Sequence, residues 1–240
     1  MTAAFHNLRY LRINARRLEH LATLALPVEQ RTVLELGAGI GDLTSFFLDR
    51  GCTVTSVEPR SDNIAAFRAR YAESPFWPAA RLTIIQAEAA GIDAVPELAP
   101  HQVVFCYGLL YHLDDPAVVL RRAAALCTEL MIVETVVAYG REDDAIESHE
   151  ENPRDPTMSV SGQACKPSRR WVFNRLRESF PFVYMPRTQP AHDQFPLDWT
   201  SREIPPERSR AIFVASRQPL DSLLLVERVP DLQFHRTGQN

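Results

Sequence analysis

The chain has 240 residues, of which 45% are apolar, and this length and composition fit one globular domain with a hydrophobic core. Its formal net charge of -4 argues against sequence-independent nucleic-acid binding through a strongly basic surface. The longest apolar run, around residues 103–113, is too short to cross a bilayer, and the first fourteen residues lack the apolar stretch of a secretion signal. We therefore expect a cytoplasmic protein without a membrane span.

Helices and strands are predicted to alternate along the first 137 residues, after an amphipathic helix over residues 5–26. The predicted strands cover residues 32–36, 52–57, 82–86, 103–107 and 130–137. The predicted helices between them cover residues 42–50, 63–71 and 116–127. Several of these strands are apolar throughout, which is typical of a parallel sheet with helices on both faces.

The second half alternates regular and irregular segments. Residues 140–168 and 186–206 are polar or rich in proline, and long stretches of this kind in a compact domain are more often binding loops than linkers. The regular segments are a helix over 169–180, strands over 182–185 and 210–216, and an apolar run at 223–226. We therefore predict an α/β fold of the Rossmann-like type, with a mostly parallel seven-stranded sheet and long C-terminal loops.

The most informative segment is the glycine turn, Gly37-Ala-Gly39-Ile-Gly41, which follows the first predicted strand. Glycines allow a sharp turn and let a ligand lie against bare backbone. An acid, Glu58, ends the next strand, where sheets of this type bind the two hydroxyls of a ribose. Glu35, in the strand before the turn, suits an ammonium group better than a pyrophosphate. S-adenosylmethionine (SAM) has both a ribose and an ammonium group.

These segments resemble the class I SAM-dependent methyltransferases. Residues 33–42 (VLELGAGIGD) resemble motif I of that family, and Glu58 stands where the family has its ribose-binding acid. Gln86-Ala-Glu88 is similar to the adenine-binding position, and residues 105–116 (FCYGLLYHLDDP) resemble the fourth motif. The match spans residues 31–137 with four motifs in the family's order. The resemblance implies SAM as the cofactor, methyltransferase activity and the SAM-methyltransferase form of the Rossmann-like fold.

The resemblance also implies where the cofactor binds. The predicted cofactor-binding residues are Glu35, Gly37, Ala38, Gly39, Gly41, Asp42, Glu58, Pro59, Ala87, Glu88, Ala89, Tyr107 and Gly108. The alternative for the glycines is a tight turn without a ligand, and for Glu58 a solvated charge at a strand end. The alternative for Glu88 is a cap of the loop at Gly91.

The single domain is expected to have four parts. Residues 1–28 would form an N-terminal helical cap, and residues 29–138 the SAM-binding core. Residues 139–217 would form the acceptor-binding loops and closing strands, and residues 218–240 a tail.

Three histidines are candidates for the base that an acceptor hydroxyl requires, namely His112, His149 and His192. His112 follows the fourth strand at the ligand-binding edge, and the other two lie beside acids in the irregular stretches. The alternatives are a packed or loop-capping ring for His112 and solvated loop positions for the others. Glu134, an acid within an apolar strand, is expected near the acceptor or paired with an arginine. No spacing of cysteines or histidines favours a metal site.

Aromatic and polar side chains are candidates to bind the methyl acceptor. The predicted substrate-binding residues are Tyr111, Arg169, Arg170, Trp171, Gln189 and Trp199. Polar groups beside aromatic faces suit a sugar or a polyhydroxylated metabolite, and arginines suit a phosphate or carboxylate. The alternative is that Trp171 anchors a helix to the sheet while the arginines are solvated.

We therefore predict a SAM-dependent methyltransferase that acts on an O or N atom of a small metabolite, for instance a sugar or a natural-product intermediate. One alternative is a tRNA-modifying methyltransferase, because residues 105–137 resemble bacterial enzymes that act on the wobble uridine of transfer RNA. Another is a SAM-binding regulatory protein without turnover. The small-molecule acceptor is the expected partner, and the chain is expected to be a monomer or a homodimer.

Overall fold

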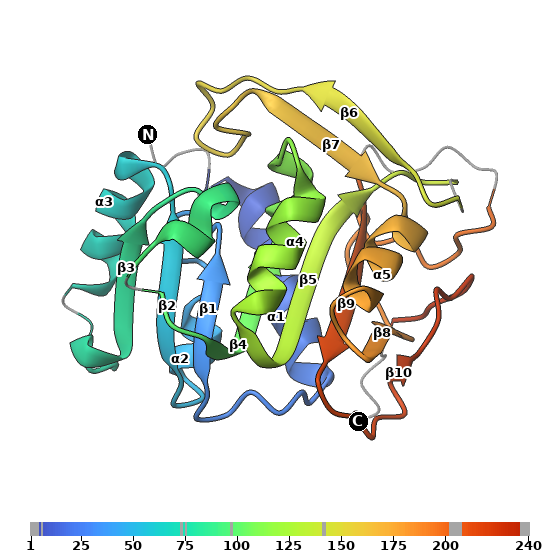
Figure 1. Cartoon of the computed structure of the whole chain (residues 1–240), viewed down its shortest axis with the longest axis horizontal. Helices are drawn as coiled ribbons and strands as arrows, with labels where there is room; N and C mark the ends of the chain where they lie inside the picture. The colour runs from blue at the N-terminus through green and yellow to red at the C-terminus, as the bar shows by residue number, and fades with distance from the viewer. Residues whose placement is uncertain are drawn as a thin grey trace.

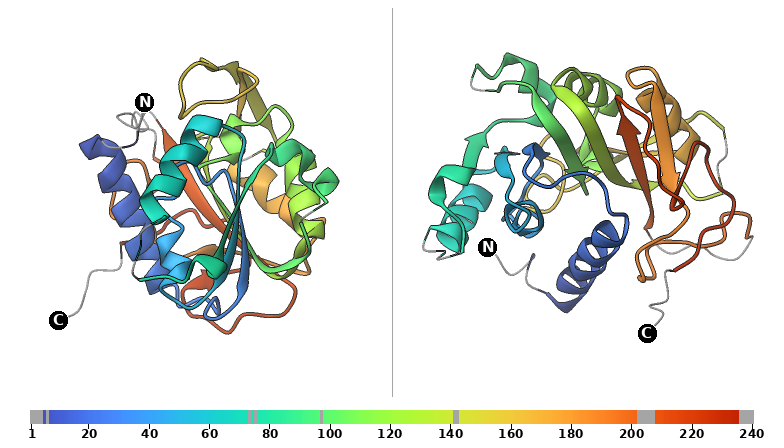
Figure 2. Two further views of the ribbon diagram at one scale, coloured as in Figure 1. Left: turned by 90° about the vertical axis from the view of Figure 1, so that its left-hand side faces the viewer. Right: turned by 90° about the horizontal axis from the view of Figure 1, so that it is seen from below.

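A twisted sheet runs through the middle of the molecule, with helices packed on both of its faces (Figures 1 and 2). The computed structural model describes residues 5, 7–72, 74, 76–96, 98–140, 143–201 and 208–235. In these residues the sheet has eight strands in the order β10-β8-β9-β5-β4-β1-β2-β3. The strands are β1 (Thr32–Leu36), β2 (Thr53–Glu58), β3 (Leu82–Gln86), β4 (His101–Tyr107), β5 (Cys127–Val137), β8 (Phe182–Pro186), β9 (Ser209–Ser216) and β10 (Leu225–Val226).

The strand directions confirm a mostly parallel sheet. Strands β1 to β5 pair in parallel with their neighbours, whereas β9 runs antiparallel between β5 and β8. The sequence predicts seven of the eight strands, and β10 adds a two-residue antiparallel ladder to β8 at the edge. That segment is too short for a strand pattern to separate it from an apolar turn.

Helices cover both faces because the strands are buried on both sides. The helices are α1 (Leu8–Thr23), α2 (Ser45–Leu48), α3 (Ser61–Tyr71), α4 (Pro116–Ala125) and α5 (Arg169–Arg177), with short 3-10 helices η2 (Ala79–Arg81), η3 (Ala89–Ala94) and η4 (Leu110–His112). Alternate strand residues enter two cores: Val33 packs with α1 and α2, and Leu34 with α4 and α5. None of the helices in the described ranges has the length and apolar character of a membrane span.

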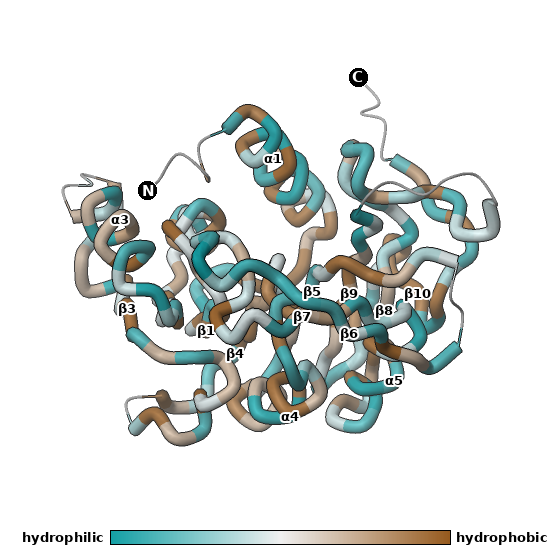
Figure 3. Tube along the Cα trace, turned by 90° about the horizontal axis from the view of Figure 1, so that it is seen from above, coloured by the Kyte–Doolittle hydropathy of each residue, from teal (hydrophilic) through white to brown (hydrophobic). Residues whose placement is uncertain are grey.

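The region 140–168, which the sequence predicts as a loop, instead contains a hairpin. Strands β6 (Ile146–Glu150) and β7 (Gln163–Pro167) pair antiparallel and form a separate two-stranded sheet. The hairpin crosses above the carboxyl ends of the main strands (Figures 1 and 3). Four of the five β6 residues are exposed, so the segment lacks the apolar alternation that indicates a strand. The segment between the two strands of the hairpin covers a cavity at this edge of the sheet.

Candidate cofactor and acceptor site

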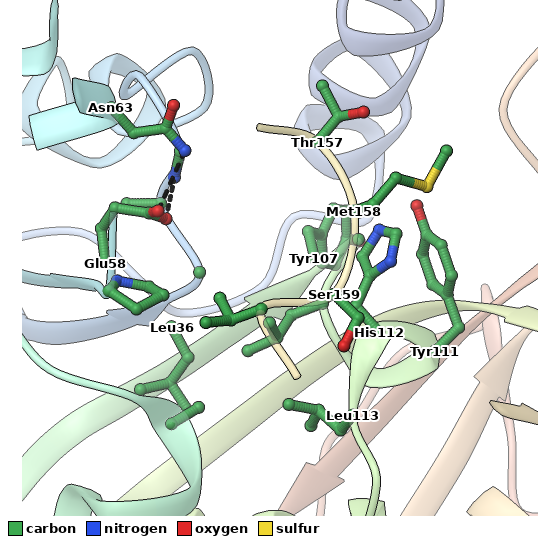
Figure 4. Close-up of a pocket in the computed structure, with 18 of the residues that line it drawn as sticks. Leu36, Glu58, Asn63, Tyr107, Tyr111, His112, Leu113, Thr157, Met158 and Ser159 are labelled. Atoms are coloured by element: carbon green, nitrogen blue, oxygen red, sulfur yellow. Dashed lines mark hydrogen bonds between the residues drawn. The ribbon is translucent and has the colours of Figure 1, made fainter. Parts of the chain in front are cut away.

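A cavity of about 540 Å³ opens at the carboxyl ends of the parallel strands. It is lined by α1, by the glycine turn after β1, by the ends of β2 and β4, and by residues 156–161 of the hairpin. Figure 4 shows Glu58 and Asn63 on one side of it and Tyr111 and His112 on the other, with Met158 on the side of Tyr111 and His112. We call these two sides the cofactor end and the acceptor end. An open α/β sheet is expected to bind its ligand at this edge.

The glycine turn forms the floor of the cofactor end. Gly37, Gly39 and Gly41 all have positive φ angles, of 69°, 57° and 78°. The backbone N–H groups of Gly37 and Ala38 donate to the carbonyl of Val57, which fixes the turn against β2. A Cβ at Gly41 would lie 2.4 Å from the Phe67 ring, so this position requires glycine for packing as well as for conformation.

Glu58 is held at the end of β2 by three donors. Its Oε2 accepts from the backbone N–H of Gly39 at 2.9 Å. Its Oε1 accepts from Asn63 Nδ2 at 3.0 Å and from the N–H of Arg60 at 3.1 Å. Burial raises the pKa of Glu58, although hydrogen bonds from Asn63, Arg60 and Gly39 act to lower it. The carboxylate therefore has a fixed orientation, which is what recognition of a pair of hydroxyls requires.

Glu35 lies deeper than Glu58. Its Oε2 accepts from the hydroxyls of Thr44 at 2.6 Å and Ser56 at 2.7 Å. Burial raises the pKa of Glu35 to about 7, against the effect of these two hydrogen bonds. The residue reaches the cavity wall, but its carboxyl group is already engaged within the protein.

The structure brings most of the predicted cofactor residues together. Those that line the cavity are Glu35, Gly37, Ala38, Gly39, Asp42, Glu58, Pro59, Glu88, Ala89, Tyr107 and Gly108. Gly41 and Ala87 do not line it. Gly41 lies against Phe67, and Ala87 packs against the core beside α4. Glu88 is exposed at the cavity wall, so its carboxylate is accessible to a ligand.

A buried charge cluster forms the acceptor end. Glu134, which is fully buried in β5, accepts from Arg17 Nη2 at 2.8 Å and from Arg210 Nη1 at 3.0 Å. Arg210 also donates through Nη2 to the hydroxyl of Tyr111 at 3.0 Å. Glu134 thus pairs with two arginines, as one of the two alternatives states, and it does not itself line the cavity.

Only one of the three candidate histidines lines the cavity in the described residues. His112 Nδ1 lies 2.5 Å from Glu151 Oε2. Burial favours the neutral ring, but Tyr111 and Glu151 raise the pKa of His112. His149 lies on β6, with Nε2 3.9 Å from Glu151 Oε1, and does not line the cavity. His192 is also away from the cavity wall and buried, and burial lowers its pKa.

Five of the six predicted substrate-binding residues also lie away from the cavity; only Tyr111 lines it. The five residues that lie away from the cavity are Arg169, Arg170, Trp171, Gln189 and Trp199. The guanidinium of Arg169 stacks 4.1 Å from the centre of the Trp199 ring, and Trp199 Nε1 donates to Gln233 Oε1 at 2.7 Å. Gln189 Nε2 donates to the same oxygen at 3.0 Å. The polar and aromatic pattern that suggests a sugar site instead fastens the C-terminal segment to the domain.

Trp171 and Arg170 differ in their surroundings on α5. Trp171 packs in the core beside α4, as the alternative for this residue states, and Arg170 is exposed. The acceptor-end residues that sequence reasoning missed are Arg17, Gln194 and Arg210. Arg17 lies on the buried face of α1, and Arg210 lies in an apolar strand. The sequence contains one signal for these arginines: Glu134, an acid within an apolar strand, needs a buried positive partner.

A covering loop, residues 153–161 between β6 and β7, reaches across the cavity mouth. Arg60 Nη2 donates to the carbonyls of Pro153 and Met158, at 3.1 Å each, and of Ser159, at 3.3 Å. Asn63 Nδ2, besides donating to Glu58, lies 3.3 Å from the carbonyl of Pro156. The covering loop is therefore attached directly to the residues that orient Glu58.

The reversed strand β9 beside β5, the glycine turn after β1 and the acid at the end of β2 define the class as a Rossmann-like methyltransferase fold. A family model described as a methyltransferase domain matches residues 6–187, and the chain belongs to this family. This membership confirms the predicted resemblance to the class I SAM-dependent methyltransferases and the predicted type of enzyme.

Curated relatives match part of the chain. "Ribosomal RNA small subunit methyltransferase A" of Anaeromyxobacter sp. (strain K) is 30% identical over 133 residues, 50% of this chain and 44% of that protein. "Ubiquinone biosynthesis O-methyltransferase" of Paracidovorax citrulli (strain AAC00-1) is 32% identical over 118 residues, 48% of this chain and 46% of that protein. The chain therefore spans about half the length of the curated relatives it matches.

A solved structure resembles a larger share of the chain. The crystal structure of the N-terminal domain of EvdMO1, in the presence of S-adenosylhomocysteine (SAH) and D-fucose, has a TM-score of 0.65. The sequence identity is 18%, with 89% of this chain and 84% of that chain covered. This similarity confirms the α/β Rossmann-like fold.

Proposed function

We propose that this chain binds SAM in the cavity and transfers its methyl group to an oxygen or nitrogen atom of a small metabolite, such as a sugar. The observation that carries the proposal is Glu58, which three donors orient at the end of β2 beside the glycine turn. Two ribose hydroxyls can donate to a carboxylate held in this way. Gly37, Ala38 and Gly39 line the cavity, so the amino-acid part of SAM can lie along their backbone.

The rest of the cavity wall fits the same ligand. Glu88 and Ala89, beyond β3, are at the side where an adenine would lie if its ribose met Glu58. Tyr107 and Gly108, at the end of β4, line the wall between the cofactor end and the acceptor end. Tyr107 has a buried hydroxyl with no partner among the described residues, which a bound polar group would satisfy.

When bound, SAM supplies a methyl group that is already activated by a positively charged sulfur. The protein then has to bring the acceptor atom into line with that methyl group and to exclude water. Residues 156–161 of the covering loop lie across the cavity and provide the exclusion. Tyr107 and Tyr111, which both line the cavity, provide a wall that orients the acceptor.

A small acceptor is favoured over a large nucleic acid by the enclosed wall. A volume of about 540 Å³ has to hold both SAM and the reacting part of the acceptor. The covering loop narrows access further, and the net charge of -4 provides no general attraction for RNA. The EvdMO1 structure determined in the presence of D-fucose supports a sugar as the first class of acceptor to test.

The test is to incubate the protein with methyl-labelled SAM and with separate fractions of small metabolites and RNA. We expect label in the metabolite fraction, and we expect Glu58→Ala to reduce the labelling at limiting SAM. Glu178→Ala, a change at an exposed residue after the C-terminal end of α5 that does not line the cavity, should leave the labelling intact. Label confined to RNA would replace the metabolite proposal with RNA modification. SAM binding without label in either fraction would contradict catalysis.

A further inference from the structure

The hydroxyl of Tyr111 is the most unusual polar group at the acceptor end. Tyr111 lies in η4, is 7% exposed and lines the cavity. Its oxygen accepts from Arg210 Nη2 at 3.0 Å, whereas its own hydrogen has no acceptor among the residues that the structure describes. Arg210 cannot rotate away, because its other nitrogens are bound to Glu134 and Gln194. The remaining direction for the Tyr111 hydroxyl hydrogen is the cavity.

The charges around Tyr111 favour an anion. Helix α1 contributes Arg17, and Tyr10 also faces Tyr111 from it; β5 contributes Glu134, and β9 contributes Arg210. Arg208, just before β9, lies with its guanidinium 6.0 Å from the Tyr111 ring. The other neighbour is His112 of η4, whose ring is 3.9 Å from that of Tyr111 and is paired with Glu151 of the hairpin. Three guanidinium groups therefore face one carboxylate in this pocket.

The net effect on Tyr111 follows from this balance. Burial alone would raise the pKa of its hydroxyl, but the positive charges of Arg210, His112, Arg17 and Arg208 lower it to about 7. A phenolate is therefore accessible near neutral pH, with Arg210 as its hydrogen-bonded counterion.

Two further polar atoms mark where an acceptor group would lie. The Tyr107 hydroxyl and Arg17 Nε are buried, belong to cavity-lining residues and have no hydrogen-bond partner among the described residues. Buried polar atoms are almost always satisfied, so a ligand group between Tyr107, Arg17 and Tyr111 would complete this end of the cavity.

His112 is less suited than Tyr111 to remove a proton. Its Nδ1 is paired with Glu151, and although burial acts to lower the pKa of the ring, Tyr111 and Glu151 raise it. A raised pKa means that the ring keeps its proton to higher pH, whereas a base must arrive without one. The contact of His112 with Glu151, whose Oε2 also accepts from the N–H of Ser159, instead attaches η4 to the covering loop.

We propose that Tyr111 is the catalytic base for an acceptor hydroxyl, with Arg210 and Arg17 as positioning residues. The proposal rests on the proposed methyl transfer. As the acceptor oxygen forms its bond to the methyl carbon, the carbon–sulfur bond breaks and its electron pair stays on sulfur. The proton of the acceptor hydroxyl moves to the phenolate oxygen of Tyr111. The acceptor is therefore a hydroxyl compound, such as a sugar or a phenol, and O-methylation is the reaction.

A pH titration of the protein without any ligand tests whether the Tyr111 hydroxyl ionises near neutral pH. The near-ultraviolet absorbance of tyrosinate is followed against pH for the wild type, for Tyr111→Phe and for the control Tyr184→Phe. Tyr184 is buried outside the cavity, where its hydroxyl accepts from the N–H of Leu220. We expect one tyrosine to ionise near pH 7 in the wild type and in Tyr184→Phe, and none in Tyr111→Phe. A wild type in which no tyrosine ionises below the ordinary value of 10 would overturn the proposal.

Turnover of the metabolite fraction that takes up label provides the second readout. Tyr111→Phe should lower kcat by roughly 10²-fold at pH 7 with little change in KM, and the loss of rate at acid pH should disappear. A change confined to KM, or an unchanged pH profile, would reduce Tyr111 to a binding residue and overturn the proposal. Calorimetric titration with SAM separates the two claims: failure to bind SAM contradicts the proposed function, and normal SAM binding with ordinary tyrosine ionisation contradicts only the role of Tyr111.

Discussion

The two ends of the cavity are built by different means. At the cofactor end, backbone N–H groups and one carboxylate form the site, and its parts lie close in sequence: Glu58 accepts from Gly39, nineteen residues earlier. At the acceptor end, buried charged side chains meet from distant segments, since Arg17 and Glu134 are 117 residues apart and Arg210 and Tyr111 are 99 apart. A shared cofactor can be bound by a local turn, whereas the acceptor pocket depends on the whole tertiary structure.

This difference predicts that the acceptor end carries more of the folding stability. Glu134→Gln leaves two buried guanidinium groups facing an uncharged amide, and we expect it to lower the free energy of unfolding by about 3–5 kcal/mol in denaturant titrations. Glu129→Gln is the matched control on the same strand, where a half-exposed carboxylate pairs with Arg31. It should cost no more than about 1 kcal/mol. Equal effects of the two changes would contradict the comparison.

The cofactor end should instead be sensitive to backbone conformation. Gly41→Ala places a Cβ at φ 78° and against the Phe67 ring, and we expect a loss of about 2–3 kcal/mol in the free energy of unfolding. Gly91→Ala, where φ is negative and no atom lies within 4 Å of the added Cβ, should stay within about 0.5 kcal/mol of the wild type. A tolerated Gly41→Ala would show that the turn is not fixed by Phe67.

Binding of SAM should depend on Glu58. Glu58→Ala removes the carboxylate that we expect to accept from both ribose hydroxyls, so calorimetry should show affinity weaker by about 1–3 kcal/mol. Asp62→Ala, an exposed acid four residues later that does not line the cavity, should leave the affinity unchanged. Unaltered binding by Glu58→Ala would remove this residue from the site, and thermal unfolding of both variants checks that the turn stays folded.

The smallest effect concerns Glu35, whose pKa is raised by burial from 4.5 to about 7. The folded state therefore binds a proton more tightly than the unfolded state. The stabilising effect of that proton is complete below pH 4.5 and is lost as pH rises through 7. Relative to Glu35→Gln, the wild type should lose stability as the pH rises from 4.5 to 7.5, because the folded-state carboxyl group ionises over this range. A constant difference between the two proteins over this range would show that Glu35 is ionised throughout.

The sequence was sufficient for the sheet and for much of the cofactor end because both are encoded locally. Strand β1 and the turn after it are contiguous, and Glu58 closes the next apolar run. The sequence does not predict the hairpin because β6 is exposed and polar, so that its residues show no burial pattern that distinguishes them from a loop. The sequence does not predict Arg17 and Arg210 as site residues, because their shared partner Glu134 is brought to them only when α1 and β9 pack beside β5. The aromatic and polar residues near Trp199 were predicted to bind the acceptor, but an arginine stacked on a tryptophan can contribute to internal packing as readily as to ligand binding.

A crystal structure of the protein grown with SAH tests the account most directly. We predict an adenosine whose ribose hydroxyls donate to Glu58, with its amino-acid part along Gly37 to Gly39 and its sulfur facing the side of the cavity that holds Tyr111. Density for SAH at any other place, or a cavity that remains blocked by the covering loop at saturating SAH, would contradict it.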